Sequence, residues 1–338
     1  MEAASRAALE PAFTSQTELA KDLEDHVTGT IRAFSPICWA LALAMALTVQ
    51  QVHAQTPTPS VFMSIDVPGA IETDANDIND AGVIVGFYVD PGGMDHGWVR
   101  IGGTFHYMDV PDAVGTFAYG INDSNQIVGW YSDSGLVEHG FMLDKGTFTT
   151  IDFPGASLTN VWSINGTGTV AGTYQDGSGV FHGFEEANGN FFTIDIPGAI
   201  HTEIHGINSL GDTAGIYYIN INGGEYENGF VRHPNGQHTT SFASFIDRIR
   251  DTKGTEVVGW YADGCCRLPL MPPFQGIVIL NPHSFNSVDF PGAVDTFCRG
   301  VNKSGAIVGV VGTYTDTSGI IHGFVAKNAA ASLKLNSD

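Results

Sequence analysis

Short apolar segments alternate with turn-forming residues along most of the chain. Between residues 147 and 189 four such segments, rich in β-branched and aromatic residues, are Phe148–Asp152, Asn160–Ile164, Thr169–Gln175 and Val180–Glu185. This length and composition are typical of β-strands. Pro154-Gly155 suits the centre of a type II turn, because proline presets φ and glycine accepts a positive φ. Asn165-Gly166 predicts a tight turn of the Asn-Gly kind.

The same unit recurs along the chain. The phrase I-D-x-P-G-A or a close variant of it places an aspartate at 66, 109, 152 and 195, each 43 residues apart, and again at 289. Two further phrases, H-G-F and V-G-x-Y, recur with the same spacing. Six copies therefore fill residues 61–330, although the fifth, near 237–283, lacks the P-G-A turn.

Four strands in 43–47 residues match the period of a β-propeller blade. A lone four-stranded sheet cannot cover both of its faces, so neighbouring sheets must stack and the ring must close. We predict an all-β protein, a β-propeller of six four-stranded blades around a central channel. A β-solenoid is the alternative. The six copies look whole, and the sequence does not show where the ring closes.

Residues 1–60 differ from the rest. An apolar run of 13 residues, Ile37–Val49, is shorter than the roughly 20 residues that cross a bilayer. Arg32 precedes it and Val52-His53-Ala54 follows it, which is the layout of a signal peptide cleaved after Ala54. The acidic stretch before it suggests a start downstream, at Val27 if its codon is GTG.

This pattern predicts a signal peptide at 1–54, a linker at 55–60, the repeats at 61–330 and a tail at 331–338. The expected location is secreted, periplasmic or extracellular. The alternative is an uncleaved anchor, in which case the protein would meet a membrane only through this segment.

The chain is acidic, with a formal net charge of −22. Removal of residues 1–54 leaves this character intact, because that segment holds three basic and six acidic residues. Such a surface repels phosphate backbones and anionic lipids, so nucleic acid is not an expected partner. Acidity also serves the solubility of a secreted protein.

The phrase G-I-N-x-x-G-x-I-V-G-x-Y followed by H-G-F resembles the bacterial extracellular repeats called the HAF family. Matching residues include Gly120-Ile121-Asn122, Ile127–Tyr131 and His139-Gly140-Phe141. The resemblance covers all six copies, with the fifth the most divergent. It implies secretion and a propeller-like fold, and it carries over no functional residue.

Polar residues that recur in every copy are predicted to serve the blade. The H-G-F position holds His96, His139, His182, Asn228, Gln275 and His322. These types share hydrogen bonding, which predicts a side chain bonded to the adjacent backbone rather than a ring of ligands in the channel.

Two series of aspartates also recur. Asp66, Asp109, Asp152, Asp195 and Asp289 precede x-Pro and are expected to accept N–H groups of the turn. Asp90, Asp133, Asp176, Asp263 and Asp316 begin a hairpin turn. Calcium is the alternative for such glycine-rich loops, but the ligand alternation of an EF-hand is missing. We predict no cofactor and no metal site.

Catalytic motifs are absent. The sequence has no G-x-S-x-G, H-E-x-x-H, G-x-x-x-x-G-K-[ST] or paired C-x-x-C. No catalytic residue is therefore assigned, and an enzyme is less expected than a binding protein.

The copies differ most visibly in one hairpin. Tyr88 to Gly97 spans 9 positions, whereas Tyr217 to Gly229 spans 12 and Tyr261 to Gly276 spans 15. Insertions in one hairpin of adjacent blades should emerge on the same face and often form a binding surface. Drift in a tolerant surface loop is the alternative. The candidate binding residues are Tyr218, Glu225, Tyr226, Arg267 and Phe274.

Three cysteines, Cys265, Cys266 and Cys298, follow the signal segment. An oxidising compartment favours a disulfide. Because adjacent cysteines rarely bond each other, Cys265 or Cys266 is expected to pair with Cys298 and leave one thiol over.

Two functions remain open. The first is a secreted binding or scaffolding module for an unknown protein or glycan. The second is an extracytoplasmic glycan hydrolase or lyase with a site at the channel mouth. An enzyme should show a cluster of non-repeated carboxylates or histidines with shifted pKa values.

Overall fold

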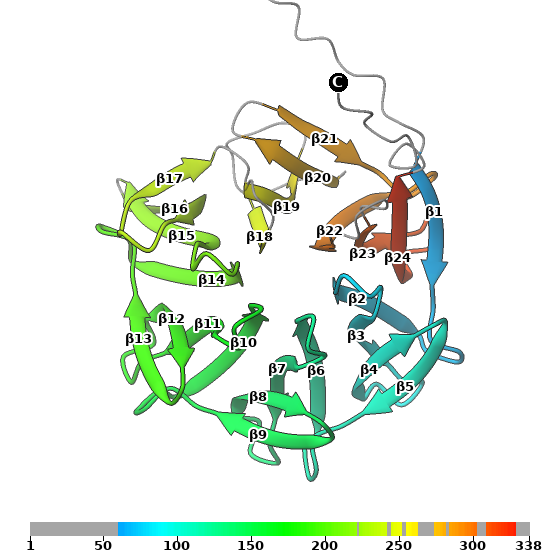
Figure 1. The fold of residues 1–338 in the computed structure, drawn as a ribbon, viewed down its shortest axis with the longest axis horizontal. Helices are drawn as coiled ribbons and strands as arrows, with labels where there is room; N and C mark the ends of the chain where they lie inside the picture. Colours follow the sequence, from blue (N-terminus) through cyan, green and yellow to red (C-terminus); the bar gives the residue numbers. More distant parts are fainter. Residues whose placement is uncertain are drawn as a thin grey trace, which may run out of the picture. The chain divides into compact units, whose positions relative to one another are not determined.

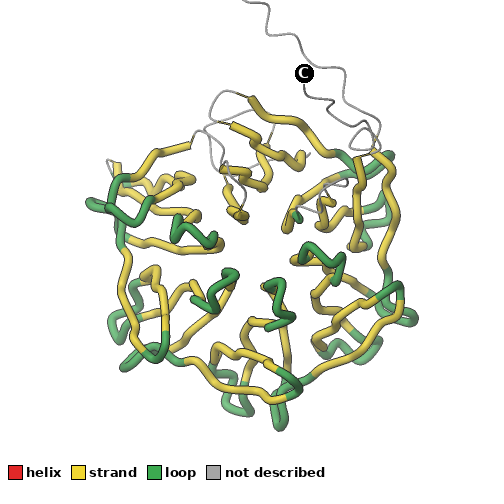
Figure 2. The backbone as a smooth tube through the Cα atoms, viewed as in Figure 1, coloured by secondary structure: helices red, strands yellow, loops and turns green. Residues whose placement is uncertain are grey.

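The computed structural model describes residues 60–221, 223–241, 245–251, 255–262, 274–281, 284–302 and 309–328. The chain divides into two compact units, Met1–Thr56 and Pro57–Asp338, and the described residues all belong to the second. The predicted signal segment and C-terminal tail lie outside them. Within the described residues there are strands and turns and no helix (Figure 2), hence no helix able to cross a membrane.

The described chain forms strands of four to nine residues. In chain order they are β1 (Ser60–Ile65), β2 (Glu72–Ile78), β3 (Ile84–Val89), β4 (Asp95–Ile101), β5 (Thr104–Met108), β6 (Gly115–Ile121), β7 (Ile127–Ser132), β8 (Glu138–Asp144), β9 (Thr147–Ile151), β10 (Leu158–Ile164), β11 (Val170–Gln175), β12 (Phe181–Ala187), β13 (Asn190–Ile194), β14 (His201–Ile207), β15 (Thr213–Ile221), β16 (Gly224–Arg232), β17 (His238–Ser241), β18 (Phe245–Asp251), β19 (Thr255–Ala262), β20 (Phe274–Asn281), β21 (Ser284–Val288), β22 (Asp295–Val301), β23 (Gly309–Thr315) and β24 (Ile321–Asn328).

Within the described residues these strands form six four-stranded antiparallel sheets. We number the blades in chain order: β2–β5, β6–β9, β10–β13, β14–β17, β18–β21, and last β22–β24 with β1. The sheets stand around one axis, with β2, β6, β10, β14, β18 and β22 innermost (Figure 1). The predicted β-propeller of four-stranded blades is confirmed, and the solenoid alternative is wrong.

The sequence copies are offset from the blades by one strand. The first strand of the third copy, β9, pairs with β8 and is therefore the outermost strand of the second blade. The expectation that each copy is whole is wrong in this respect. The ring closes where β1 pairs with β24, from Ser60↔Asn328 to Ile65↔Gly323, so the last blade contains both ends of the repeat region.

The innermost strand of every blade carries a register shift, for example between Ala118 and Gly120 in β6. The V-G-x-Y glycine lies opposite this irregularity. A Cβ atom built on Gly129 would lie 1.9 Å from the carbonyl oxygen of Phe117. Only glycine allows the two backbones to approach so closely, which explains why this glycine recurs.

Of the two kinds of turn predicted from the sequence, one has the predicted form and the other is longer. The P-G turn is as predicted: Ala156 N donates to Phe153 O at 3.1 Å and Gly155 has φ of 82°. The Asn165 turn is longer than a two-residue Asn-Gly turn. Gly168 N donates to Asn165 O and Gly168, not Gly166, has the positive φ, 86°. Asn165 Oδ1 accepts from Thr167 N and Thr169 N, which holds the longer turn.

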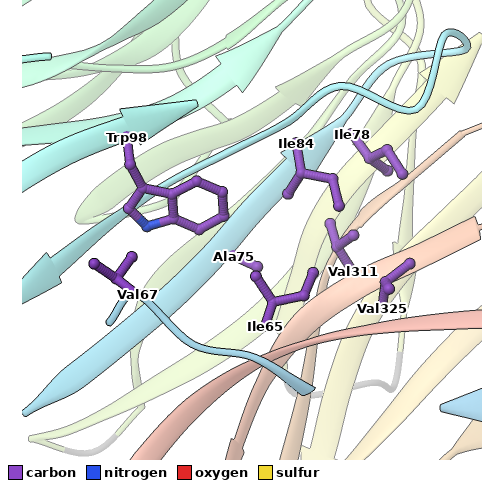
Figure 3. Packing of buried hydrophobic residues seen from close by; sticks show 8 residues of the cluster. All are labelled: Ile65, Val67, Ala75, Ile78, Ile84, Trp98, Val311 and Val325. Carbon is purple, nitrogen blue, oxygen red and sulfur yellow. The ribbon is translucent and has the colours of Figure 1, made fainter. Parts of the chain in front are cut away.

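Apolar clusters fill the spaces between blades. The cluster in Figure 3 joins the last and first blades: Ile65 and Val325 come from the last blade, and Ala75 and Trp98 from the first. Trp98 is fully buried, and its Nε1 donates to Phe87 O at 2.9 Å. Burying this surface is the main stabilising term of such a ring.

Buried asparagines link neighbouring blades at four junctions in the described residues. Asn79 Nδ2 donates to the carbonyl oxygen of Asn122, Asn122 to that of Asn165, and Asn165 to that of Asn208. Asn302 Nδ2 donates in turn to Asn79 O at 3.0 Å, which continues the chain across the closure. The recurrent I-N phrase therefore ties neighbouring sheets together near the axis.

Candidate functional site

The recurrent histidines are held by two aspartates each. His139 Nδ1 lies 3.0 Å from Asp152 Oδ2, and its Nε2 lies 3.7 Å from Asp133 Oδ2. The ring stacks on Tyr131, with centroids 5.3 Å apart. The same arrangement surrounds His96, His182 and His322.

These contacts correct two predictions. The histidine partner is a carboxylate and not the adjacent backbone. Four of the x-Pro aspartates accept from histidine, namely Asp66, Asp109, Asp152 and Asp195. A threonine hydroxyl takes the turn N–H instead: Phe153 N donates to Thr159 Oγ1 at 3.0 Å. Four of the hairpin aspartates are as predicted, as when Asp133 Oδ1 accepts from Gly135 N and Val137 N, and Asp263 lies outside the described residues.

The pKa shifts in these histidine–aspartate units are caused by neighbouring groups. Backbone N–H groups, chiefly that of Met94, hold the pKa of Asp90 below its usual value. Burial lowers the pKa of His96, but the carboxylates of Asp109 and Asp90 outweigh burial and raise it overall. Because the unit recurs in four blades, it serves the architecture and does not mark one site.

The predicted long hairpin of the fourth blade is present. β15 and β16 pair through nine positions, out to Ile221↔Gly224. Glu225 is exposed, and Tyr226 is 47% exposed near the tip. Tyr218 lies nearer the sheet, where its hydroxyl donates to Glu227 Oε2 at 3.1 Å. The structure thus separates Tyr218 from the two tip residues.

The other predicted residues fall largely outside the described part. Arg267, Cys265 and Cys266 lie outside the described residues, so the Cys298 disulfide stays a prediction. Phe274 begins β20. Cys298 on β22 is fully buried in a cluster with Val310 and Phe324.

The innermost strands carry a set of side chains that does not repeat from blade to blade. At the position of the register shift, the five blades other than the fifth hold Asn76, Tyr119, Trp162, His205 and Arg299. The residues two positions earlier in the sequence of these strands are Asp74, Phe117, Asn160, Glu203 and Phe297.

Aromatic side chains from this set, together with Trp130 of the adjacent strand β7, form a continuous series across three blades. Phe117 stacks on Trp130 with ring centroids 3.9 Å apart. Tyr119 meets Trp162 of the next blade edge to face at 4.5 Å, and Trp162 meets His205 of the fourth blade at 5.5 Å. We call Phe117, Tyr119, Trp130 and Trp162 the axial arc. All four are partly exposed, unlike the core aromatics.

Carboxylates flank the axial arc. At its fourth-blade end, His205 Nε2 lies 3.5 Å from Glu203 Oε2. Burial raises the pKa of Glu227 to about 7, the Tyr218 hydroxyl lowers it, and the charge of Glu203 raises it. Burial, with the charges of Glu227 and Glu203, also raises the pKa of Tyr218 above its ordinary value.

The first-blade end is also acidic. Burial raises the pKa of Asp74 well above its usual range, the charge of Arg299 lowers it, and Glu72 raises it. Arg299 comes from the last blade, so this group bridges the ring closure. The described residues contain no cluster of three or more side chains suited to hold a metal ion.

Sequence reasoning missed the axial arc. The signal was present, because Tyr119, Trp162 and His205 occupy one column of the repeat and differ in chemistry. The comparison of hairpin lengths between copies led to the long hairpins instead, because the innermost strands do not differ in length between copies.

No protein-family model matches the chain, and no curated protein sequence matches it. Solved structures are similar in fold. AofleA from Arthrobotrys oligospora is 11% identical, with 80% of this chain and 86% of that chain covered and a TM-score of 0.51. A mutant of the Aleuria aurantia lectin in complex with Fucα1-6GlcNAc is 10% identical, with coverage of 78% and 93% and a TM-score of 0.47. The likeness to AofleA shows the β-propeller fold alone.

Proposed function

We propose that this propeller is a binding module whose ligand is a glycan, held at the axial arc. The observation that carries the proposal is the arc itself: partly exposed aromatic rings in mutual contact, three of them on innermost strands and Trp130 on the adjacent strand β7, at positions where the blades do not repeat. A residue set that occurs once in a repeat protein suits one ligand, whereas a repeated set serves the fold.

The chemistry of the arc suits sugar rings. Flat aromatic faces pack against the C–H faces of a pyranose, and carboxylates accept hydrogen bonds from its hydroxyl groups. Glu203 and Glu227 at one end and Asp74 at the other supply such acceptors. These local carboxylates favour neutral or cationic glycans over uronates and other anionic ones at the arc.

The long hairpin extends the proposed surface. Trp162 contacts His205, His205 lies beside Glu203, and Tyr218 bonds Glu227, which leads from the arc to β15 and β16. Glu225 and Tyr226 would then contact parts of the glycan outside the axial region. Their sequence-based role as binding residues is kept as part of this proposal.

The test is a glycan array followed by calorimetry with the best-bound oligosaccharide. Trp162→Ala should weaken binding at least tenfold, because an aromatic stacking face is lost. Phe192→Ala is the matched control, since Phe192 is 58% exposed on the outermost strand β13, away from the innermost strands of the arc. Equal affinity of both variants and the wild type would refute the site.

An enzyme acting on glycans is the second candidate. It is supported by Glu227, whose pKa near 7 suits proton transfer at neutral pH and whose partner is the Tyr218 hydroxyl. Incubation with the bound oligosaccharide separates the two functions. Cleavage that Glu227→Gln abolishes, with binding retained, identifies an enzyme; an intact oligosaccharide identifies a binding module.

Secretion belongs to the same proposal and rests on the sequence of residues 1–54. Extracytoplasmic glycans would be accessible to a protein exported by that segment. N-terminal sequencing of the mature protein should give Gln55 as the first residue.

A further inference from the structure

A cavity of about 400 Å³ opens between the first and second blades. Its lining includes Val83, Val99 and Ile101 from the first blade and Ile121, Ile127 and Leu143 from the second. It lies where β2 turns into β3 and β4 into β5. Strand direction alternates in an antiparallel sheet, so these turns are at the opposite end of the blades from the histidine–aspartate units.

Two apolar positions that line this cavity in the first blade, those of Val83 and Ile101, are polar in the second and fourth blades. In the second blade the positions of Val83 and Ile101 hold Gln126 and Asp144, which bond each other at 3.3 Å. In the fourth blade they hold Asp212 and His233, 2.7 Å apart.

The neighbouring positions show the same contrast. Val99 and Leu143 face the cavity from the two blades. Between the third and fourth blades the corresponding residues are Glu185 and Arg232, which form an ion pair at 3.9 Å. Polar pairs thus occupy, in the second and fourth blades and between the third and fourth, sites that are apolar here.

The blade fold does not require an exposed apolar side chain at this position. Ile101 is 51% exposed, although its counterparts in the second and fourth blades are a carboxylate and an imidazole. The buried side chains Val83, Ile121 and Ile127 belong to the core between the two blades, so the cavity is an open end of that core. Its volume falls within the roughly 300–1,000 Å³ of small-molecule sites.

The rim supplies one positive charge. Lys145 lines the cavity, is exposed and forms no ion pair with another described residue. Asn125 accepts from Asn79 Nδ2 through its Oδ1 at 2.9 Å, which leaves its amide hydrogens to donate. Asp144 also lines the rim, but Gln126 Nε2 donates to its Oδ2. An ammonium and an amide donor beside an apolar wall suit a carboxylate on an apolar body.

We propose that this cavity binds a small organic acid with an apolar body, the body lying against Val83, Ile101 and Leu143 and the carboxylate at Lys145. The site is separate from the axial arc and does not depend on the proposed function. It needs no change in the fold, because the cavity is already open.

Calorimetry with three eight-carbon probes tests the proposal on the full chain. Octanoate should bind saturably and at least tenfold more tightly than octanol or octylamine. Weaker or equal binding of octanoate relative to octylamine would overturn the assignment of an acid, and absence of saturable octanoate binding would overturn the site.

Variants locate the binding. Val83→Gln combined with Ile101→Asp installs the pair that the second blade carries, so it is compatible with the blade architecture. It should weaken octanoate binding at least tenfold. Should it fail to fold, Ile101→Asp alone tests the same wall, since that side chain is half exposed.

Lys145→Gln should bring octanoate affinity down to that of octanol. Leu210→Ala is the matched control, an apolar residue 66% exposed in the corresponding turn of the fourth blade, and should bind octanoate as the wild type does. Octanoate affinity unchanged by Ile101→Asp and by Lys145→Gln would place the binding elsewhere and refute the proposal.

Discussion

At the scale of single residues, Glu227 couples the candidate site to pH. Its carboxyl has a pKa of about 7 in the folded protein against an ordinary value of 4.5, with burial as the main cause. Between these values the folded state binds more protons than the unfolded state, so this residue lowers stability as pH rises. Glu227→Gln should therefore raise the free energy of unfolding at pH 8 by about 1–2 kcal/mol, allowing for solvent screening, and change it little at pH 4.

Urea denaturation at both pH values measures this difference. The matched control is Glu225→Gln, on the same strand and exposed, which should leave the pH profile as it is. Parallel profiles of wild type and Glu227→Gln would show that the folded-state pKa of Glu227 is not raised.

The role of a side chain could be predicted from the sequence only where the residue and its partner recur within one copy. The hairpin role of Asp133 followed from its place after V-G-x-Y, and the structure confirms it. The pairing of His139 with Asp152 did not follow, because the two are 13 residues apart and meet only when β8 and β9 pair. Trp162 and His205 lie farther apart still and belong to different blades.

At the scale of strands and turns, the recurrent glycine of V-G-x-Y sets the shape of each blade. Cβ atoms built on Gly129 and on its counterparts Gly86, Gly172, Gly215 and Gly312 would lie 1.9–2.1 Å from a carbonyl oxygen of the innermost strand. Gly129→Ala should force β6 and β7 apart and cost more than about 3 kcal/mol of unfolding free energy.

Gly177→Ala is the matched control for this prediction. A Cβ on Gly177 meets no atom within 4 Å, and its φ is outside the left-handed region. Its free energy of unfolding should stay within about 0.5 kcal/mol of the wild type. Two equally mild alanine variants in urea denaturation would contradict the close approach of Gly129 to Phe117.

Strand positions were predictable because their signal is local. The predicted segment Thr169–Gln175 corresponds to β11, Val170–Gln175, and the P-G turn has the expected positive φ at Gly155. The Asn165 turn was predicted too short, because the side chain of Asn165 accepts two backbone N–H groups and favours the longer form. A dipeptide signal does not include that competition.

At the scale of the whole propeller, closure depends on one strand from the beginning of the repeat region. Phe62 of β1 packs against Phe290 and Phe324, with ring centroids 5.5 and 6.0 Å apart. Sequence periodicity could not locate this seam, since a periodic chain reads the same wherever the ring is cut. Only the pairing of β1 with β24 shows that the first strand belongs to the last blade.

A circular permutant tests this closure. Ser60 pairs directly with Asn328, so a two-residue turn can join them, and new ends can be placed in the exposed turn at Pro68-Gly69. β1 then follows β24 as an ordinary outermost strand, and all inter-strand pairs are kept. The permutant should have a thermal midpoint within a few degrees of a linear chain that starts at Pro57. A chain that lacks Ser60–Ile65 should melt at a clearly lower temperature, because Phe62 and Ile65 leave two apolar clusters. If this truncated chain had the same thermal midpoint as the permutant, β1 would not be the strand that closes the ring.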